Sequence, residues 1–420
     1  MPIYLCLMLV QAICFSMFFT VQLIYHVTVI GLSPLQMVLV GVVLEVVTFA
    51  FEIPTGVVAD VFSRRRSILI GILLMGCSYT LEGAVALFWA ALLSQVFWGI
   101  GYTFTSGANQ AWITDEIGED AVGQVFLRGR QMWLLGIVTG TLLAMLLGVL
   151  HIQLPMVLAG VGMLALSLAL LLLMPERHMT PAPAEVRSTW GHMRATAQAG
   201  MRLSLARPVV RTVVLISLIV GLASEGFERL STPQLIGRFT FPTLFGSDSP
   251  VLWFGLSGVV GALLGLLASE LFRRNRRAGA TLGSNGQASA RLLAALAATD
   301  VAAVAIFALG GNLLLAFAML WVRSMVSAIS VPVQAAWLNR HLDPATRATV
   351  ISLSGQANSI GQVPGGLALG WVANRMTIGA ALLGSALILS PTVALYQRMA
   401  GRSRTPADSP LVREVVDPAD

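Results

Sequence analysis

Residues 56–66 read GVVADVFSRRR and directly follow an almost unbroken apolar run at residues 35–50. An ionised side chain at the centre of a bilayer costs roughly 2.5–3.5 kcal/mol, so an aspartate followed by three consecutive arginines indicates that the chain has reached water. The two stretches together predict a membrane-spanning helix followed by a charged loop at the membrane surface.

The composition of the 420-residue chain is that of an integral membrane protein. Apolar residues make up 56% and charged residues 11%, and the mean hydropathy is +0.81, outside the range of soluble domains. Apolar segments of about 20 residues, long enough to cross a hydrocarbon core, recur along the chain. We predict an all-α membrane protein with twelve transmembrane helices near residues 4–30, 35–56, 67–87, 88–112, 131–150, 155–174, 209–232, 250–271, 291–309, 311–335, 348–372 and 378–397.

The arginines predict how these helices are oriented. The formal charge of +6 rests on arginine clusters at residues 64–66, 187–211, 273–277, 340–347 and 398–404, which fall in alternate loops. The intervening loops carry little beyond Arg238 and Arg375. By the positive-inside rule this predicts a multi-pass protein of the inner (plasma) membrane with both termini and the central loop in the cytoplasm, rather than a nucleic-acid-binding protein.

The chain shows no constellation typical of an enzyme. The first helix begins close to Met1 without the features of a removable signal peptide, so it is expected to remain as a span. The three cysteines lie in apolar segments and the five histidines are scattered, and no phosphate-cradling loop is present. We therefore expect no catalytic residues, metal, cofactor or direct use of ATP.

The chain divides into two related halves. We expect an N-terminal six-helix bundle at residues 1–174, a cytoplasmic linker at 175–208, a C-terminal bundle at 209–397 and a cytoplasmic tail at 398–420. VADVFSRR at residues 58–65 is echoed by ASELFRRN at residues 268–275. At a second offset Trp112 matches Trp337 and Gln131 matches Gln356, and at the same offset Gly136 and Gly140 match Gly361 and Gly365. A parallel repeat of two six-helix halves explains both echoes.

The opening stretch resembles the cytoplasmic loop signature of the major facilitator superfamily, G-x-x-x-D-R-x-G-R-R-R, which lies between the second and third helices. Val61 and Ser63 stand where that signature usually has arginine and glycine. The matching residues are Gly56, Asp60, Arg64, Arg65 and Arg66.

The resemblance implies a fold of two pseudo-symmetric six-helix bundles and a gating role for this loop. In that family the loop holds the two halves together on the cytoplasmic side when the cavity opens outward. Asp60 is then expected to face the start of the eleventh helix near residues 346–348, where free N–H groups favour an anion. Arg64 and Arg65 are expected to reach Asp115 and Glu116. A purely topological role for the arginines is the alternative.

Two further stretches resemble the macrolide-efflux-like branch of bacterial drug:proton antiporters: FEIPTG at residues 51–56 and VFLRGRQ at residues 125–131. Gln95 stands where such antiporters often carry an arginine in the fourth helix, and the fifth helix lacks their proline. GQVPGG at residues 361–366 is in the repeat-related eleventh helix. Proton coupling through the usual arginine is therefore not predicted.

Ionisable residues inside predicted spans are candidates for proton coupling. Glu45 lies near the middle of the second span, where no arginine of its half reaches a similar depth; it is the first candidate for a protonation switch, with a structural hydrogen-bonded acid as the alternative. The other candidates are Glu225 and Glu228 on the seventh span, which could bind a cationic substrate or neutralise Arg229, and Asp300 and Arg323, which could form an ion pair.

Mixed amide and aromatic stripes at helical spacing predict the cavity faces, because lipid-facing positions favour plain aliphatic side chains. The first, fourth, seventh and tenth helices line the cavity in the resembling family. The cavity candidates are Phe15, Phe18, Gln22, Trp98, Tyr102, Asn109 and Arg323. Aromatic rings, amides and a few acids suit a bulky, amphipathic, neutral or cationic molecule.

These inferences predict a monomeric secondary transporter in the lipid bilayer that exports hydrophobic or cationic drug-like compounds in exchange for protons by alternating access. Its expected partners are a small-molecule substrate and protons, and no nucleic acid. The alternatives are a proton-coupled uptake symporter for a small metabolite and an uncoupled lipid-flipping or receptor-like protein of the same fold.

Overall fold

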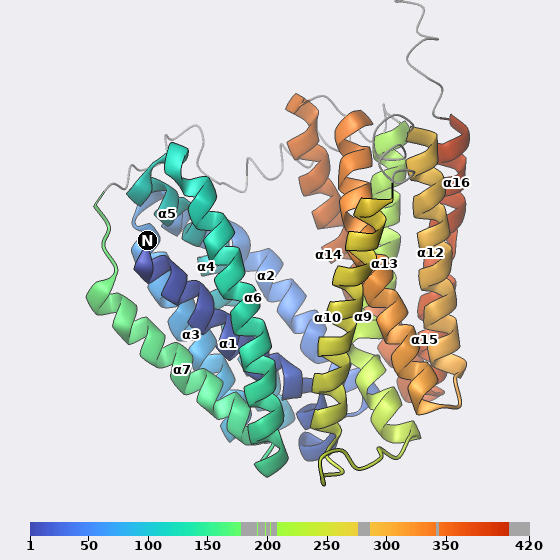
Figure 1. Cartoon of the computed structure of the whole chain (residues 1–420), viewed down its shortest axis with the longest axis horizontal. Helices are drawn as coiled ribbons and strands as arrows, with labels where there is room; N and C mark the ends of the chain where they lie inside the picture. The colour runs from blue at the N-terminus through green and yellow to red at the C-terminus, as the bar shows by residue number, and fades with distance from the viewer. Residues whose placement is uncertain are drawn as a thin grey trace, which may run out of the picture.

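A computed structural model of the chain describes residues 1–177, 208–275, 286–341 and 344–402, and between residues 178 and 207 only Gly191, Gln198 and Arg202. Its helices form two groups that lie side by side (Figure 1). The first group comprises α1 (Pro2–Tyr25), η1 (His26–Ile30), α2 (Pro34–Val61), α3 (Arg64–Ala84), α4 (Phe88–Thr105), α5 (Ala108–Ile117), α6 (Glu119–Leu150) and α7 (Gln153–Leu173). The second comprises α9 (Pro208–Arg238), α10 (Pro250–Arg274), α12 (Gly286–Leu309), α13 (Leu313–His341), α14 (Pro344–Arg375), α15 (Ile378–Leu389) and α16 (Pro391–Arg402).

The predicted all-α class is confirmed, and local breaks alter three of the predicted spans. The fourth span is interrupted at Gly107, whose φ of 75° favours glycine, so α4 ends at Thr105 and α5 forms a separate short helix. The fifth span begins at Glu119 rather than near residue 131. The twelfth divides at Pro391 and extends to Arg402, into the stretch expected as a tail.

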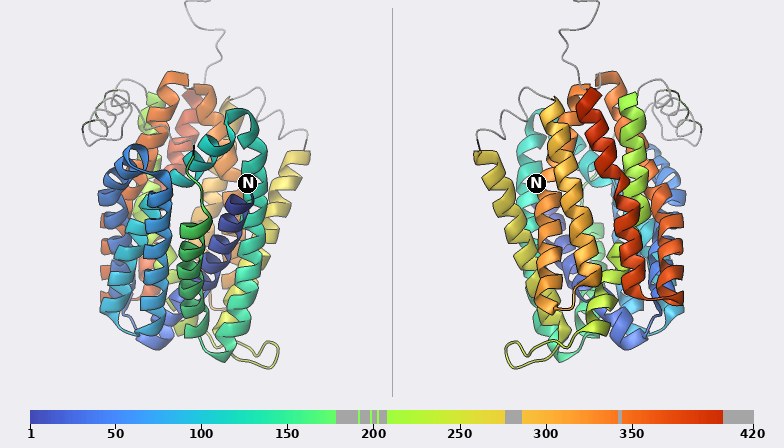
Figure 2. Two further views of the ribbon diagram at one scale, coloured as in Figure 1. Left: turned by 90° about the vertical axis from the view of Figure 1, so that its left-hand side faces the viewer. Right: turned by 90° about the vertical axis from the view of Figure 1, so that its right-hand side faces the viewer.

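By length and composition, ten helices of the described residues are apolar enough to cross a membrane, counting α1 with η1 and α15 with α16 as one each. The remaining two long passes are α4 and α14, which both supply polar residues to an internal cavity. On the outer faces, leucines are strongly exposed, for example Leu172 at 76% and Leu387 at 73%. Figure 2 shows these outer faces, with α7 on one side and α16 on the other. Such surfaces are stable only against lipid.

Glycines place the inner helices of each group in close contact, and they do so at repeat-related positions. In the first group, a Cβ on Gly136 or Gly140 of α6 would strike the backbone carbonyls of Leu9 and Ile13 of α1. In the second, Gly361 and Gly365 of α14 pack in the same way against the carbonyls of Leu218 and Leu222 of α9. Small residues allow such backbone contact between membrane helices.

The two groups meet at one end of the molecule and separate at the other (Figure 1). At the closed end, where α1 ends, Gly370 of α14 packs against Val38 of α2, and Gly148 of α6 packs against Val251 of α10. At the open end, where α2 ends and α3 begins, a cavity lies between the groups. The cavity between the groups is therefore open at one end of the molecule and sealed at the other.

Candidate functional site

A cavity of about 1190 Å³ lies between the two groups of helices and extends to α5 at the open end. It is lined from α1 by Tyr4, Met8, Gln11 and Phe15, from α2 by Leu44, Glu45, Thr48, Phe49, Glu52 and Ile53, from α3 by Met75, from α4, α5 and the turn between them by Trp98, Tyr102, Thr105, Ser106, Gly107, Asn109 and Gln110, from α6 by Trp133, and from α14 by Ser352, Gly355, Gln356, Ser359 and Gln362. This volume is above the usual range of about 300–1,000 Å³ for small-molecule pockets, so a bulky organic molecule fits.

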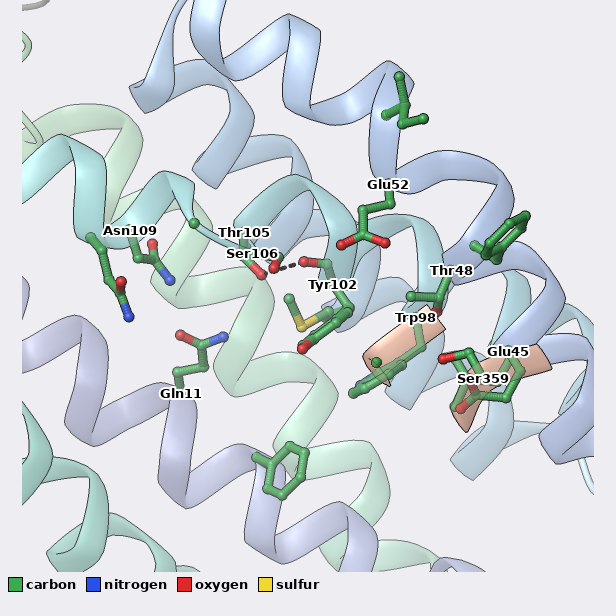
Figure 3. Close-up of a pocket in the computed structure, with 18 of the residues that line it drawn as sticks. Gln11, Glu45, Thr48, Glu52, Trp98, Tyr102, Thr105, Ser106, Asn109 and Ser359 are labelled. Carbon is green, nitrogen blue, oxygen red and sulfur yellow. Dashed lines mark hydrogen bonds between the residues drawn. The ribbon is translucent and has the colours of Figure 1, made fainter. Parts of the chain in front are cut away.

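The charged residues of the cavity wall are both acids. Glu45 and Glu52 lie two helical turns apart on α2 with Thr48 between them, so all three face the same way. Neither carboxylate has a hydrogen-bond or ion-pair partner among the described residues, and no described arginine or histidine lines the cavity. Figure 3 shows these three residues on one side of the pocket and Gln11 on the other. The cavity wall therefore offers two acidic side chains and no described basic one, an arrangement suited to a cation.

Aromatic rings form the middle of the wall (Figure 3). Trp98 and Tyr102 stack with their ring centroids 5.3 Å apart and their planes within 6°. Phe15 of the wall lies 5.9 Å from Trp133, and Phe19, which does not line the cavity, meets Trp98 edge to face at 5.5 Å. Such rings give a flat apolar surface on which a hydrophobic or cationic ligand can stack.

Four of the residues predicted for the cavity line it: Phe15, Trp98, Tyr102 and Asn109. Phe18, Gln22 and Arg323 do not, which corrects the prediction. Phe18 is 1% exposed and stacks on Tyr79 of α3. Gln22 is also buried and donates a hydrogen bond to Glu82 of α3. Phe18 and Gln22 lie on a different face of α1 from Phe15. That face packs against the neighbouring helix α3.

Arg323 is held within the second group. Its Nε donates to Asp300 Oδ1 at 2.8 Å, and its guanidinium lies 3.8 Å from the centroid of the Phe227 ring. Asp300 and Arg323 are each 25% exposed. The ion pair considered as an alternative is thus formed, and the cation–π contact on Phe227 fixes the guanidinium away from the cavity.

A second ion pair lies where the two groups meet. Arg229 Nε donates to Glu225 Oε1 at 2.9 Å one turn earlier on α9, and the Glu225 side chain is 3% exposed. Both side chains pack directly against Gly41 of α2. Glu228 is exposed and makes no hydrogen bond or ion pair with any described residue. Glu225 therefore lies where the two groups meet at the closed end. Gly41, the residue of α2 that it contacts, comes one helical turn before the cavity acid Glu45.

The opening stretch is anchored within the first group. Arg64 pairs with Asp115 of α5 and also donates to the carbonyl of Ala111 at 3.0 Å. Arg65 donates to the carbonyl of Leu171 on α7, and Arg66 is exposed. Glu116 accepts a hydrogen bond from the backbone N–H of Arg177 at 2.7 Å.

Glu176 is the member of this cluster that the sequence analysis missed. Its carboxylate accepts from Ser63 Oγ at 2.6 Å and from the N–H of Arg65 at 3.0 Å, so it binds the N-terminus of α3. Its position directly after Pro175, at the end of a predicted span, was the available signal. A carboxylate at the exposed N–H groups of a helix is a stabilising arrangement.

Asp60 and Gly56 lie one turn apart at the end of α2. Asp60 has no hydrogen-bond or ion-pair partner within the described part of the chain. The expected partners near residues 346–348 have side chains outside the described residues.

Two six-helix groups that enclose a cavity and seal it at one end define the class of membrane transporters that work from a central site. A family model described as the Major Facilitator Superfamily matches residues 4–366. The chain belongs to the major facilitator superfamily.

Individual relatives are distant. The chain is 26% identical over 127 residues to an uncharacterised transporter of this type, YxaM of Bacillus subtilis (strain 168), and the match spans 30% of this chain and 32% of that protein. A crystal structure of a mutant of the nucleoside transporter NupG matches with a TM-score of 0.76 at 14% identity over 95% of this chain and 99% of that one.

Other solved structures share the fold. A bacterial homologue of the human lysosomal transporter Spinster, in an inward-facing and unoccupied conformation, matches with a TM-score of 0.69 at 16% identity over 95% of this chain and 96% of that one. A peptide-bound transporter of the POT family matches with a TM-score of 0.66 at 13% identity over 96% of each chain. At these identities the likeness shows the fold alone.

Proposed function

We propose that this protein is a monomeric secondary transporter that exports bulky, amphipathic cations in exchange for protons. The observation that carries the proposal is the cavity wall: two unpaired carboxylates, stacked aromatic rings and amides, with no described basic side chain. A cation gains from both the carboxylates and the ring faces, whereas an organic anion would face like charge. The proposal includes membership of the macrolide-efflux-like branch of bacterial drug:proton antiporters.

The open end faces the cytoplasm in this proposal, so the structure is an inward-facing form in the inner membrane. Arginines support this orientation, because Arg64, Arg65 and Arg66 lie at the open end, as do Arg273 and Arg274 of α10. The helix ends on the closed side carry only Arg238 and Arg375 among the described residues. Excess arginine on the cytoplasmic side is the usual bias. An inward-facing cavity loads its export substrate from the cytoplasm.

Glu45 is the proposed coupling acid. It shares one face of α2 with Val38 and Gly41, which form the closed seam against α14 and α9. Movement of α2 at the seam therefore also moves the carboxylate in the cavity. A carboxylate binds either a proton or a cationic substrate strongly, so loading one favours release of the other.

Proteoliposomes that hold the purified protein test this proposal with tetraphenylphosphonium as the cation. An imposed proton gradient is expected to drive its exchange, and Glu45→Gln to abolish the dependence on the gradient while cation binding is retained more weakly. Glu119→Gln, an acid exposed at the start of α6, is the matched control. If the cation moves down its own gradient at a rate that does not depend on the proton gradient, the protein is not coupled to protons.

The direction of transport needs whole cells. Expressing cells are expected to accumulate less of a fluorescent cationic dye than cells without the protein, and to resist more of a panel of macrolides, dyes and quaternary amines. Greater accumulation of dye would instead support the uptake symporter.

A further inference from the structure

A second acidic cluster lies inside the first group of helices, outside the cavity wall. Glu82 of α3 and His26 of η1 are both fully buried, and Glu82 Oε1 lies 2.6 Å from His26 Nε2. The same oxygen accepts from Gln22 Nε2 at 2.9 Å. The other carboxylate oxygen accepts from Ser94 Oγ at 2.5 Å and Gln95 Nε2 at 3.2 Å. Four side chains from three segments of chain thus surround one carboxylate.

The regular α-helix of α1 ends just before His26. α1 passes into the five-residue π-helix His26–Ile30, which ends at Gly31 with a φ of 70°. π-Helical turns recur at functional sites because the extra residue re-aims the side chains around it. Here His26 follows Gln22 by one turn and meets the same carboxylate oxygen. The π-helical turn therefore begins at the residue that contacts Glu82.

Two buried atoms of the cluster, His26 Nδ1 and Gln95 Oε1, have no hydrogen-bond partner among the described residues. With Glu82 ionised, neutral His26 donates from Nε2 and leaves a lone pair on Nδ1, and the cluster carries a net charge of −1. A buried net charge in a low-dielectric interior is unfavourable, and a hydrogen-bonded pair of opposite charges reduces that cost. One added proton would convert the cluster to such a pair.

The groups that face the pair do not provide another cation. α4 contributes the neutral Ser94 and Gln95. The titratable neighbours are Tyr79 on α3 and Tyr25 on α1, and Gln153 of α7 reaches only Tyr25, at 3.5 Å. No arginine within the described residues pairs with Glu82, so His26 is the base available to it.

We propose that Glu82 and His26 form a proton-binding site within the first group of helices, separate from Glu45. A proton from water bonds to the lone pair of His26 Nδ1, which gives an imidazolium paired with the Glu82 carboxylate, and the same N–H bond breaks when the proton is released to water.

The site is close to the cavity wall. Tyr79 lies one turn before Glu82 on α3, and its hydroxyl accepts a hydrogen bond at 3.1 Å from Trp98 Nε1, whose ring lines the cavity. Gln95 lies one turn before Trp98 on α4. A change of charge at the Glu82–His26 pair therefore changes the electrostatic potential directly behind the aromatic wall of the cavity. This coupling to transport, unlike the proton site itself, rests on the proposed function.

Nitrogen-15 NMR of histidine-labelled full-length protein in detergent or nanodiscs tests the site. His26 is one of five histidines, and its signal is identified by its loss in His26→Asn. Between about pH 5 and about pH 9, His26 is expected to change from imidazolium to the neutral form with Nε2 protonated. Glu82→Gln is expected to abolish this change, because the imidazolium loses its carboxylate. Glu119→Gln, the exposed control, should leave it unchanged.

A His26 signal that stays neutral over the whole range in the unmodified protein would overturn the site and leave a static hydrogen-bond network. That result does not depend on whether Glu82→Gln folds. Since the titration needs no substrate, a protein that titrates but fails to exchange tetraphenylphosphonium counts against the transport proposal alone. In proteoliposomes, the pH profile of exchange by Glu82→Gln should differ from that of the unmodified protein; an unchanged profile would exclude the pair from coupling.

Discussion

Glu225 and Arg229 form a buried ion pair of 2.9 Å one turn apart on α9, at the place where the two halves of the molecule meet. Both side chains pack against Gly41 of α2, so the seal at the closed end depends on a charged pair covered by a residue without a side chain. In the transport cycle that we propose, separation of the halves at this end would expose that pair to water. The cost of keeping two charges dry would then disappear, which would favour the open arrangement.

Gly41→Ala is expected to weaken this seal. The added Cβ would collide with the Glu225 carboxylate and press on Arg229, so the ion pair must break or the halves must part. Breaking a buried pair costs about 3–5 kcal/mol, enough to reduce transport by at least about tenfold. The measurement is the exchange rate in proteoliposomes. Gly258→Ala on α10, where a Cβ meets open space, is the control and should keep the original rate.

Gly365→Ala and Gly140→Ala should each lower the stability of the folded protein. In both cases the new Cβ meets a backbone carbonyl, of Leu222 on α9 and of Ile13 on α1 respectively, which cannot rotate away. We expect a loss of about 1–3 kcal/mol in the free energy of unfolding, seen as a lower midpoint of thermal unfolding in detergent. Equal stability of these variants and the Gly258→Ala control would show that the close helix contacts are not formed.

Asp300→Asn should destabilise the second half of the molecule. It leaves the Arg323 guanidinium, 25% exposed and stacked on Phe227, without its anion. Because the pair is partly solvated, we expect a loss of about 1–2 kcal/mol rather than the full cost of a dry broken pair. Adding Arg323→Gln should recover part of that loss in a double-mutant cycle. Strictly additive effects would mean that the two side chains do not interact.

Glu176→Gln should loosen the start of α3. The variant removes the charge that binds the Ser63 hydroxyl and the N–H of Arg65. A lost helix cap costs about 1 kcal/mol, which should appear as faster hydrogen exchange of the first turn of α3 and a lower unfolding midpoint. Arg66→Gln changes an exposed side chain of the same turn and should alter neither measurement; a matching effect there would point to a general charge effect.

Much of the fold could be predicted from the composition of the chain and from the spacing of its apolar segments. The apolar runs predicted twelve spans because a helix must be about 20 residues long to cross a bilayer, whichever helices surround it. The match of Gly136 and Gly140 with Gly361 and Gly365 was visible in the sequence, and the structure shows why these positions are small: each group brings two helix backbones together there. Breaks such as Gly107 depend on a single φ angle, so the spacing of apolar residues did not reveal them.

The candidate site was predicted in part. Phe15, Trp98 and Tyr102 lie in the cavity wall, whereas Phe18 and Gln22, from the same stripe as Phe15, turn toward α3. Helical spacing places residues on a face of one helix, but which neighbour covers that face is set by how the helices pack. Glu82 was not among the predicted site residues, yet packing buries it completely against His26.

The sequence by itself determined that the protein lies in a membrane, that it has two related halves and where its charged loops fall, because these depend on local apolar content and on repeated residues. Tertiary structure alone decided which charges are paired, which are left open in the cavity and which end is sealed. Those outcomes depend on distances between helices far apart in the chain, as in the contacts of Glu225 with Gly41 and of Glu82 with His26. In a low-dielectric interior, a few ångströms between such groups decide whether a charge is stabilised or remains available for binding.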